Sequence, residues 1–225
     1  MMQVSEMQLS ILFVVAFLLL ILITEWLHKK LHVDSEICRK FLHVSGGFLT
    51  LLFPLFFKSY LWVLLLCTLA FTILLATRIL GKLSSVHQVR RKSIGSVIFP
   101  IPICICFWVS ENLNNTLLFH LPVLVLSISD TFAEIGGKKW GHTSMRFSGG
   151  KTLIGSIFFA ASCLVISLFV FSIGSSLNIA QQLFFSLIIT LCATLTESVS
   201  FKGLDNLTVP IVVLLVLTSL EKSIL

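Results

Sequence analysis

The chain has 225 residues, of which 56% are hydrophobic and only 12% are charged, and its net charge is +6. A soluble domain averages about 25% charged residues, so this composition excludes a single soluble domain and indicates a polytopic membrane protein. In such a protein a basic excess anchors cytoplasmic loops more often than it binds nucleic acid, and we expect no nucleic-acid partner.

The apolar runs of the chain are continuous, whereas the strands of a membrane barrel alternate apolar and polar residues. Only helices and closed barrels satisfy their own backbone in lipid. The sequence therefore predicts an all-α fold, a bundle of seven or eight transmembrane helices that forms a single integral-membrane domain over residues 1–225. The eight candidate spans are residues 9–27, 41–57, 60–76, 94–110, 116–135, 152–173, 180–199 and 206–220. The second and the last are short for a span, which needs roughly 20 apolar residues.

The first apolar run, Leu9 to Leu27, has no basic residue before it and no small-residue cleavage site after it, so we interpret it as a retained span. With eight spans, all but two of the 16 Lys and Arg residues, Lys58 and Lys222, lie on one side. The positive-inside rule places that side in the cytoplasm and both termini outside it. The polar clusters described next then all lie at cytoplasmic span ends, where nucleotides are available.

Two polar clusters lie at the entrances of the second and fourth spans. In the first, Glu36, Lys40 and His43 share one face if the segment is helical. A lone His inside an apolar run is usually a polar packing residue, but Arg39 and Lys40 beside it favour an anionic ligand. The second cluster is the basic and serine-containing segment 90–100, RRKSIGSVIFP.

Asp130 and Glu134 are four residues apart near the end of the fifth span, so a helix would carry both carboxylates on one face. Acids at such a position are costly and by default functional. Two oxygen ligands suit Mg²⁺, which takes the rest of its shell from water and phosphates. The alternative is that the two acids form helix-end ion pairs with Lys138 and Lys139.

The segment from Gly136 to Lys151 is interpreted as a loop, because it is rich in Gly, Lys and Arg. It runs into an apolar helix at Thr152, and a helix N-terminus offers free N–H groups to a phosphate. The alternative is a solvated loop that only anchors the membrane topology. Gly155 and Ser156, on the same helix, either permit close helix packing or line a groove for phosphates.

A last cluster connects the final two spans. Glu197 ends the seventh span, and Asp205 and Asn206 open the eighth, where they are also suited to cap a helix. Capping does not explain an acid as close to the apolar region as Glu197.

Together these clusters resemble the motifs of the phytol kinase, dolichol kinase and CTP-dependent diacylglycerol kinase group, to which phosphatidate cytidylyltransferase is more distantly related. The motifs, in the family order, are E-x-x-R-K-x-x-H (Glu36, Arg39, Lys40, His43), R-x-S-x-G-S ending in Pro (Arg91, Ser93, Gly95, Ser96, Pro100), D-x-F-A-E-x-x-G (Asp130, Phe132, Ala133, Glu134, Gly137), G-K-T-x-x-G-S (Gly150, Lys151, Thr152, Gly155, Ser156) and T-x-E-S…D-N-L-x-V-P (Thr196, Glu197, Ser198, Asp205, Asn206, Leu207, Val209, Pro210).

The resemblance implies a CTP-dependent lipid kinase, a phosphotransferase whose acceptor is the hydroxyl of a membrane lipid alcohol such as phytol, a polyprenol or diacylglycerol. It implies Mg²⁺ or a similar divalent cation, held by Asp130 and Glu134. The expected catalytic residues are Asp130, Glu134, Lys151, Glu197 and Asp205. The expected substrate- and nucleotide-binding residues are Arg39, Lys40, His43, Arg91, Ser93, Lys138, Lys139, Gly150, Thr152, Gly155, Ser156 and Asn206.

Two alternatives to the kinase stay open at this point. One is nucleotidyl transfer, in which phosphatidate attacks the α-phosphorus of CTP and a CDP-lipid forms. The other is a non-enzymatic transporter or lipid-binding membrane protein. In transporters, charged residues usually lie near the bilayer midplane, whereas here the span centres hold no ionised residue.

Overall fold

The computed structural model describes residues 5–87, 93–141 and 151–224, with side chains to residue 220. These residues form helices and no β-strand, which confirms the predicted all-α fold. The helices are α1 (Glu6–Leu31), α2 (Ser35–Thr50), α3 (Phe53–Phe56), α4 (Tyr60–Ile79), α5 (Ser84–His87), α6 (Gly95–Ile98), α7 (Pro100–Asn112), α8 (Leu117–Leu124), the π-helical turn η1 (Val125–Ser129), α9 (Asp130–Trp140), α10 (Leu153–Gly174), α11 (Ile179–Val199) and α12 (Asp205–Ile224).

Six helical units of the described chain are long and apolar enough to cross a membrane, which supports an integral membrane protein. They are α1, α4, α6 with α7, the continuous unit of α8, η1 and α9, α10 and α11. The two remaining predicted spans fall on α2 with the short α3, and on α12. All eight predicted segments are therefore helical, and α2, with 16 residues, is shorter than a full span, as expected.

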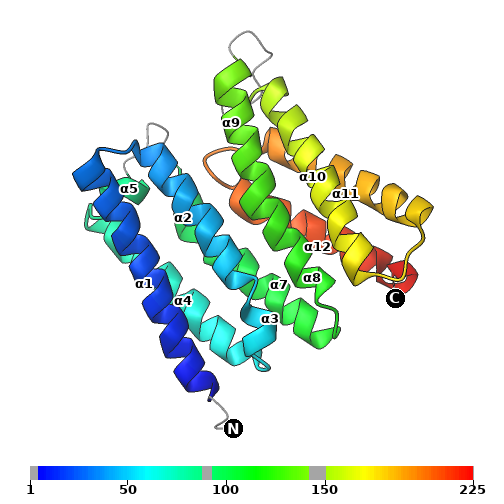
Figure 1. Ribbon diagram of the computed structural model, residues 1–225, viewed down its shortest axis with the longest axis horizontal. Helices are drawn as coiled ribbons and strands as arrows, with labels where there is room; N and C mark the ends of the chain where they lie inside the picture. Colours follow the sequence, from blue (N-terminus) through cyan, green and yellow to red (C-terminus); the bar gives the residue numbers. More distant parts are fainter. Residues whose placement is uncertain (1–4, 88–92, 142–150, 225) are drawn as a thin grey trace.

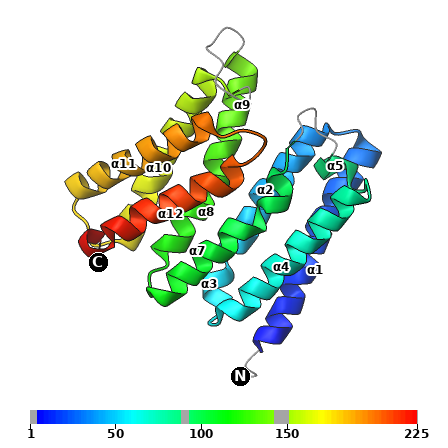
Figure 2. The ribbon, with the colours of Figure 1, turned by 180° about the vertical axis from the view of Figure 1, so that it is seen from behind.

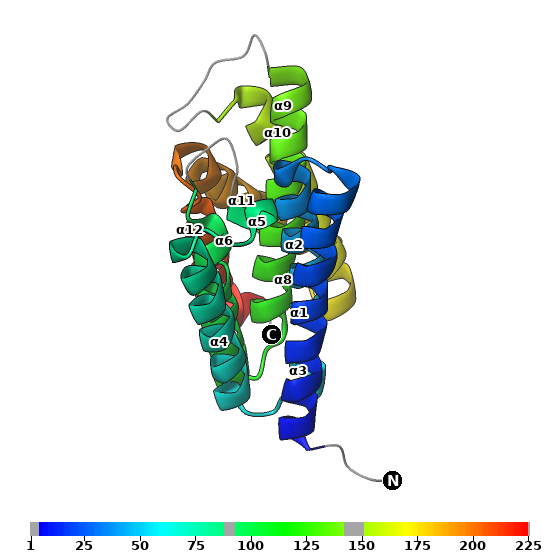
Figure 3. The same cartoon turned by 90° about the vertical axis from the view of Figure 1, so that its left-hand side faces the viewer.

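The long helices lie side by side in one bundle, and both chain ends lie at its lower end in the view of Figure 1. The N-terminal end of α2 and the C-terminal end of α9 lie at the opposite, upper end. Seen from behind, α4, α7 and α12 form the other face (Figure 2). Helix α10 packs against both α9 and α11, and α4 packs against α7. In the side view, α4 on the left and α1 on the right both face the viewer, at the left-hand side of Figure 1 (Figure 3).

A row of phenylalanine rings fills the lower part of the bundle. Phe53 on α3 contacts Phe13 on α1 and Phe107 on α7, with ring centroids 5.2 and 6.5 Å apart. Phe107 in turn meets Phe119 on α8 at 5.6 Å. These edge-to-face contacts bury large apolar area, and they close the bundle below the charged groups described in the next subsection.

The segment from Gly136 to Lys139 was expected to be a loop, and this interpretation is wrong, because α9 continues to Trp140. Its glycines serve helix packing. A Cβ at Gly136 would lie 2.5 Å from the ring of Phe158 on α10, and a Cβ at Gly155 on α10 would lie 2.9 Å from the carbonyl oxygen of Ala133. Two helices approach this closely only where a side chain is missing.

Helix α2 makes a similar approach to the π-helical turn η1. A Cβ at Gly47 would lie 2.7 Å from Cβ of Ser127. The neighbouring glycine differs, because a Cβ at Gly46 would meet only an atom of Phe17, at an ordinary 4.0 Å. The contact at Gly47 sets the distance between α2 and η1, the segment that immediately precedes Asp130.

This pair of glycines makes a matched test. Both substitutions to Ala raise helix propensity by up to about 1 kcal/mol, but only Gly47→Ala forces overlap with η1, at a cost of about 1–3 kcal/mol. We expect Gly47→Ala to lower the melting temperature in detergent and Gly46→Ala to leave it unchanged or raised. Equal melting temperatures for the two variants would show that α2 and η1 are not in close contact.

Candidate functional site

The first charge cluster joins α2 to α9 and comprises Arg39, Lys40, Asp130, Glu134 and Lys138. The ammonium group of Lys40 lies between two acids: it donates to the carboxylate of Asp130 and lies 2.8 Å from Oε2 of Glu134. Arg39 donates to the same Glu134 oxygen at 3.0 Å. The predicted helical spacing is therefore confirmed, since Asp130 and Glu134 share one face of α9 and meet the basic face of α2.

Of the two lysines expected to form helix-end ion pairs with the acids of α9, only Lys138 does so. Lys138 pairs with Glu134 one turn earlier on α9 and with Glu36 on α2, so the predicted helix-end ion pair exists as part of the first charge cluster. The ammonium group of Lys139 lies 4.6 Å from the ring centre of Trp140 instead. Lys139 is thus placed outside the first charge cluster.

The second charge cluster comprises Lys151, Ser156, Glu197 and Asp205, from the start of α10, the end of α11 and the start of α12. Nζ of Lys151 lies 2.6 Å from Oε1 of Glu197 and 2.6 Å from Oδ2 of Asp205. The hydroxyl of Ser156 donates to the other oxygen of Glu197 at 3.1 Å. The Glu197 side chain is only 2% exposed, so Lys151 and Ser156 supply the partners that a buried carboxylate needs.

The two charge clusters are electrostatic neighbours. Burial disfavours the charged form of Lys151, but the carboxylates of Asp205, Asp130 and Glu197 outweigh it and raise the pKa of this ammonium group above its ordinary value. Asp130 belongs to the first charge cluster and the other two acids belong to the second. Lys151 therefore stays protonated at neutral pH and stabilises carboxylates on both sides of it.

His43 is held by the π-helical turn. Its Nε2 lies 3.0 Å from the carbonyl oxygen of Leu126 and 4.0 Å from Oδ2 of Asp130. A carbonyl oxygen only accepts, so Nε2 carries a proton and donates it to Leu126. The ring centroid lies 4.7 Å from that of Phe99. His43 thereby joins α2, η1 and the residue that precedes α7 beside the first charge cluster.

Ser93 and Asn206 belong to a contact between the start of α6 and the turn before α12. The hydroxyl of Ser93 accepts from the Gly95 N–H at 3.1 Å, and the Ile94 N–H donates to the carbonyl of Lys202 at 3.0 Å. Gly203 has a φ of +87°, and a Cβ there would lie 2.6 Å from the Gly95 nitrogen. Only glycine fits both conditions. This contact places Asn206 beside the second charge cluster. The backbone N–H of Asn206 donates to Oδ1 of Asp205 at 3.1 Å.

Thr152 and Gly155 build the first turn of α10. The Thr152 hydroxyl accepts from the Gly155 N–H at 3.1 Å, which caps the helix directly after Lys151. Gly155 packs against α9. Of the two interpretations of this glycine, close helix packing therefore applies. Ser156 takes a polar role instead, through its hydrogen bond to Glu197. Two further predicted residues, Arg91 and Gly150, lie outside the described part of the chain.

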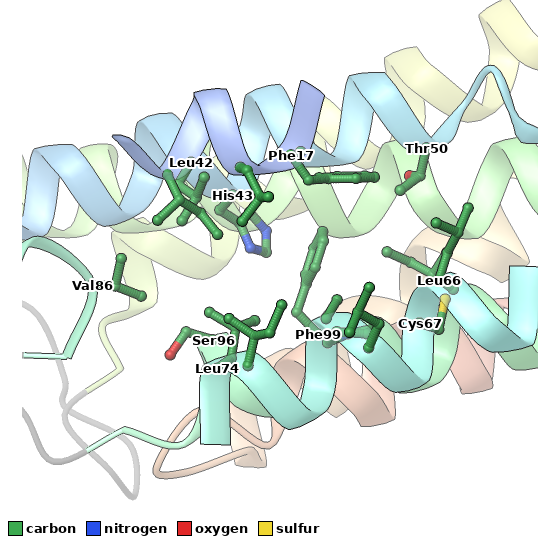
Figure 4. A pocket seen from close by; sticks show the side chains of 18 of the residues that line it. Phe17, Leu42, His43, Thr50, Leu66, Cys67, Leu74, Val86, Ser96 and Phe99 are labelled. Atoms are coloured by element: carbon green, nitrogen blue, oxygen red, sulfur yellow. The ribbon is translucent and has the colours of Figure 1, made fainter. Parts of the chain in front are cut away.

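A cavity of about 120 Å³, which the sequence does not predict, lies beside the first charge cluster (Figure 4). Its walls come from α1, α2, α4 and the α6–α7 segment, and Arg39, His43 and Asn206 are among its lining residues. Apolar residues that line a cavity and apolar residues that face lipid have the same composition and period in a membrane helix. No signal in the sequence could therefore have found the walls on α1 and α4.

The acids of the first charge cluster suit a divalent cation only in company with phosphates. Asp130 and Glu134 both contact the Lys40 ammonium group, so the two carboxylates lie close together. No group of three or more His, Cys, Asp or Glu side chains is arranged for a metal among the residues that the structure describes. Mg²⁺ is commonly held by one or two carboxylates plus substrate phosphates, and this pair fits that mode.

Comparison with known proteins assigns the family. The Cytidylyltransferase family matches residues 1–199. A phosphatidate cytidylyltransferase of Rickettsia typhi is 32% identical over 136 residues, 57% of this chain and 57% of the relative. The protein of the same name from Rickettsia conorii is 31% identical over 143 residues, 60% of each chain. The chain thus spans less than two thirds of these curated relatives, and no solved structure matches it.

These findings correct the predicted enzyme class. The expectation was a phosphotransferase with an alcohol acceptor, whereas the curated relatives are named as nucleotidyltransferases. The predicted enzyme class is therefore wrong, because the relatives are named phosphatidate cytidylyltransferase, and the alternative of cytidylyl transfer is favoured. The predicted membrane enzyme of lipid and CTP metabolism agrees with the match over residues 1–199. The chain belongs to the cytidylyltransferase family.

Proposed function

We propose that this protein transfers the cytidylyl group of CTP to the phosphate of phosphatidate. A phosphate oxygen of the lipid attacks the α-phosphorus of CTP and forms a new phosphorus–oxygen bond. The bond between the α-phosphorus and the bridging oxygen to the β-phosphorus breaks, and the electron pair leaves with pyrophosphate. The names of the curated relatives support this reaction, and the two charge clusters support its location.

The pairing of Asp130 with Lys40 is the observation that carries the proposal. An alcohol must lose a proton to become a nucleophile, and this needs a base. The Asp130 carboxylate is instead engaged with the Lys40 ammonium group, and the other carboxylates of the two charge clusters are likewise engaged with Lys or Arg side chains. A phosphomonoester has its second pKa near about 6, so the phosphate of phosphatidate is an anion at neutral pH and needs cations rather than a base.

The roles of the side chains follow from these charges. Lys40 and Lys151 each hold two carboxylates, and an incoming triphosphate offers them stronger, multiply charged partners. Arg39 adds a planar guanidinium suited to phosphate. We assign these three cations to the phosphates of CTP and phosphatidate, where fixed positive charge stabilises the transition state of phosphorus chemistry.

Asp130 and Glu134 would hold a divalent cation once a triphosphate supplies the remaining ligands. Bound there, the cation neutralises phosphate charge. The carboxylates of Glu197 and Asp205 are engaged with Lys151, so we assign them to the positioning of this lysine. His43 is held in place by its hydrogen bond to the Leu126 carbonyl, and we assign it to shaping the entrance to the cavity. We further propose that residues 1–225 act as one integral-membrane domain with the charge clusters at the cytoplasmic surface, as the distribution of basic residues indicates.

The products test the reaction directly. Purified protein is given CTP labelled in the cytosine ring, phosphatidate and Mg²⁺, and we expect labelled CDP-lipid and one pyrophosphate per turnover. Asp130→Asn, which keeps the shape of the side chain but removes its charge, should lower turnover at least about 100-fold, as loss of a charged group in such a site typically does. Labelled CDP with a doubly phosphorylated lipid, or no consumption of CTP at all, would contradict the proposal.

Lys151→Met tests the second charge cluster. We expect turnover to fall about 10²- to 10³-fold through lost charge stabilisation. The melting temperature should fall too, since uncompensated buried carboxylates cost about 3–5 kcal/mol. Lys29→Met is the matched control, because the Lys29 side chain is 65% exposed and its partner Glu25 keeps hydrogen bonds from Ser84 and Ser85 when Lys29 is removed.

Lys151→Arg, which keeps the positive charge, should restore the melting temperature and part of the turnover. A Lys151→Met variant that loses stability but turns over CTP at the wild-type rate would reduce Lys151 to a purely structural ion-pair partner.

A further inference from the structure

The cavity beside the first charge cluster has a polar end and an apolar end. Figure 4 shows His43 and Ser96 toward one end, Phe17 and Phe99 midway, and Leu66 and Cys67 at the other. Every lining residue beyond the polar end, apart from Thr50, is apolar, and the Thr50 hydroxyl is already engaged with the carbonyl of Gly47 at 2.7 Å. The apolar part therefore offers a ligand no further polar partner from the described residues.

The polar end of the cavity is suited to an anion. Arg39 and Asn206 line it together with His43. Nε of Arg39 is buried and has no hydrogen-bond partner among the described residues, although the same guanidinium is paired with Glu134 through Nη2. A buried N–H donor without a partner is costly, and a phosphate oxygen at the cavity mouth would satisfy it.

The depth of the cavity matches one leaflet of a membrane. Arg39 and Thr50 mark its two ends on α2, and eleven residues of α-helix rise about 16 Å. The hydrocarbon core of a bilayer is about 30 Å thick, so the cavity reaches from the charged end of the bundle to about the midplane. Phe53, which lies within the row of phenylalanine rings, closes the bottom together with Leu66.

The cavity also reaches the side of the bundle. Leu18 on α1 and Leu69 on α4 both line it, and they are 41% and 40% exposed, so the cavity is not closed off at these two helices. Figure 3 shows α1 and α4 as the two helices at this edge. In a membrane this surface meets lipid chains, so an alkyl chain can enter between α1 and α4 without passing through water.

We propose that this cavity binds one acyl chain of the lipid substrate, with the lipid phosphate at Arg39, and that its closed bottom at Phe53 and Leu66 limits the length of that chain. The inference rests on the proposed function for the identity of the lipid as phosphatidate. The cavity has a polar end with an unsatisfied donor, a depth of about one leaflet and a lateral opening to lipid. These three features together match a single acyl chain attached below a phosphate.

Two alanines of α4 provide the test. Ala70 lines the cavity between its bottom at Leu66 and its mouth near Leu74, whereas Ala76 is exposed on the outer surface. Ala and Leu are both strong helix formers, so Ala70→Leu and Ala76→Leu make the same chemical change on the same helix. Only Ala70→Leu adds three carbons to the interior of the cavity.

We expect Ala70→Leu to raise KM for dioleoyl phosphatidate about tenfold, or about 1.4 kcal/mol, which corresponds to the burial of about two methylene groups. KM for dihexanoyl phosphatidate should rise much less, because little of a short chain extends beyond Ala70. Ala76→Leu should change neither. Equal effects of Ala70→Leu on the short and the long substrate would overturn the assignment.

A second measurement does not depend on the reaction. Phosphatidate with a diazirine near the end of one long acyl chain is photolysed on the wild-type protein without CTP, and labelled peptides are identified by mass spectrometry. Labels on Thr50, Leu66 or Cys67 that Ala70→Leu abolishes support the chain site, even if the protein forms a product other than CDP-lipid. Labels confined to the outward faces of α10 and α11 would overturn it, whatever the outcome of the product assay.

Discussion

Lys40 and Lys151 each hold two carboxylates together at one end of an otherwise apolar bundle. A buried charge without a partner costs several kcal/mol, so these ion pairs constrain which helix ends lie together. Lys40 connects α2 to α9, and Lys151 connects the start of α10 to the end of α11 and the start of α12. Because Lys151 also stabilises Asp130, the charged ends of five helices form one electrostatic unit that faces the same boundary.

Glycine residues at the helix contacts allow these helix ends to lie close together. Gly136 and Gly155 let α9 and α10 approach until a Cβ would overlap its neighbour, and Gly47 does the same for α2 against η1. The π-helical turn then presents the Leu126 carbonyl to His43. Acids on α9 thereby come within reach of the bases on α2, whereas larger residues at these positions would separate the helices and leave the charges unpaired. The same packing leaves the apolar cavity between α1, α2, α4 and α7 open to lipid.

A lipid kinase and a cytidylyltransferase share most of their parts, which explains the error in the predicted enzyme class. Both bind a nucleoside triphosphate and a lipid at a membrane surface, and both need fixed cations and paired acids there. The motifs around Asp130, Lys151 and Glu197 report these shared needs. The reactions differ in the nucleophile, an alcohol or a phosphate. The motifs do not specify the nucleophile, and the partner of Asp130 is Lys40, which lies 90 residues away in the sequence.

The sequence by itself determined the membrane class, the eight helical segments and the residues that carry charge, because hydropathy and the i, i+4 period are local properties. It also placed Asp130 and Glu134 on one face. Only the tertiary structure decided that Gly136 to Lys139 continue a helix, since the reason is a contact with Phe158 on another helix. The partners of the buried charges, the exclusion of Lys139 from them and the cavity at Arg39 were likewise decided by packing. Each depends on the distance between residues that are far apart in the chain, and a local pattern holds no information on that distance.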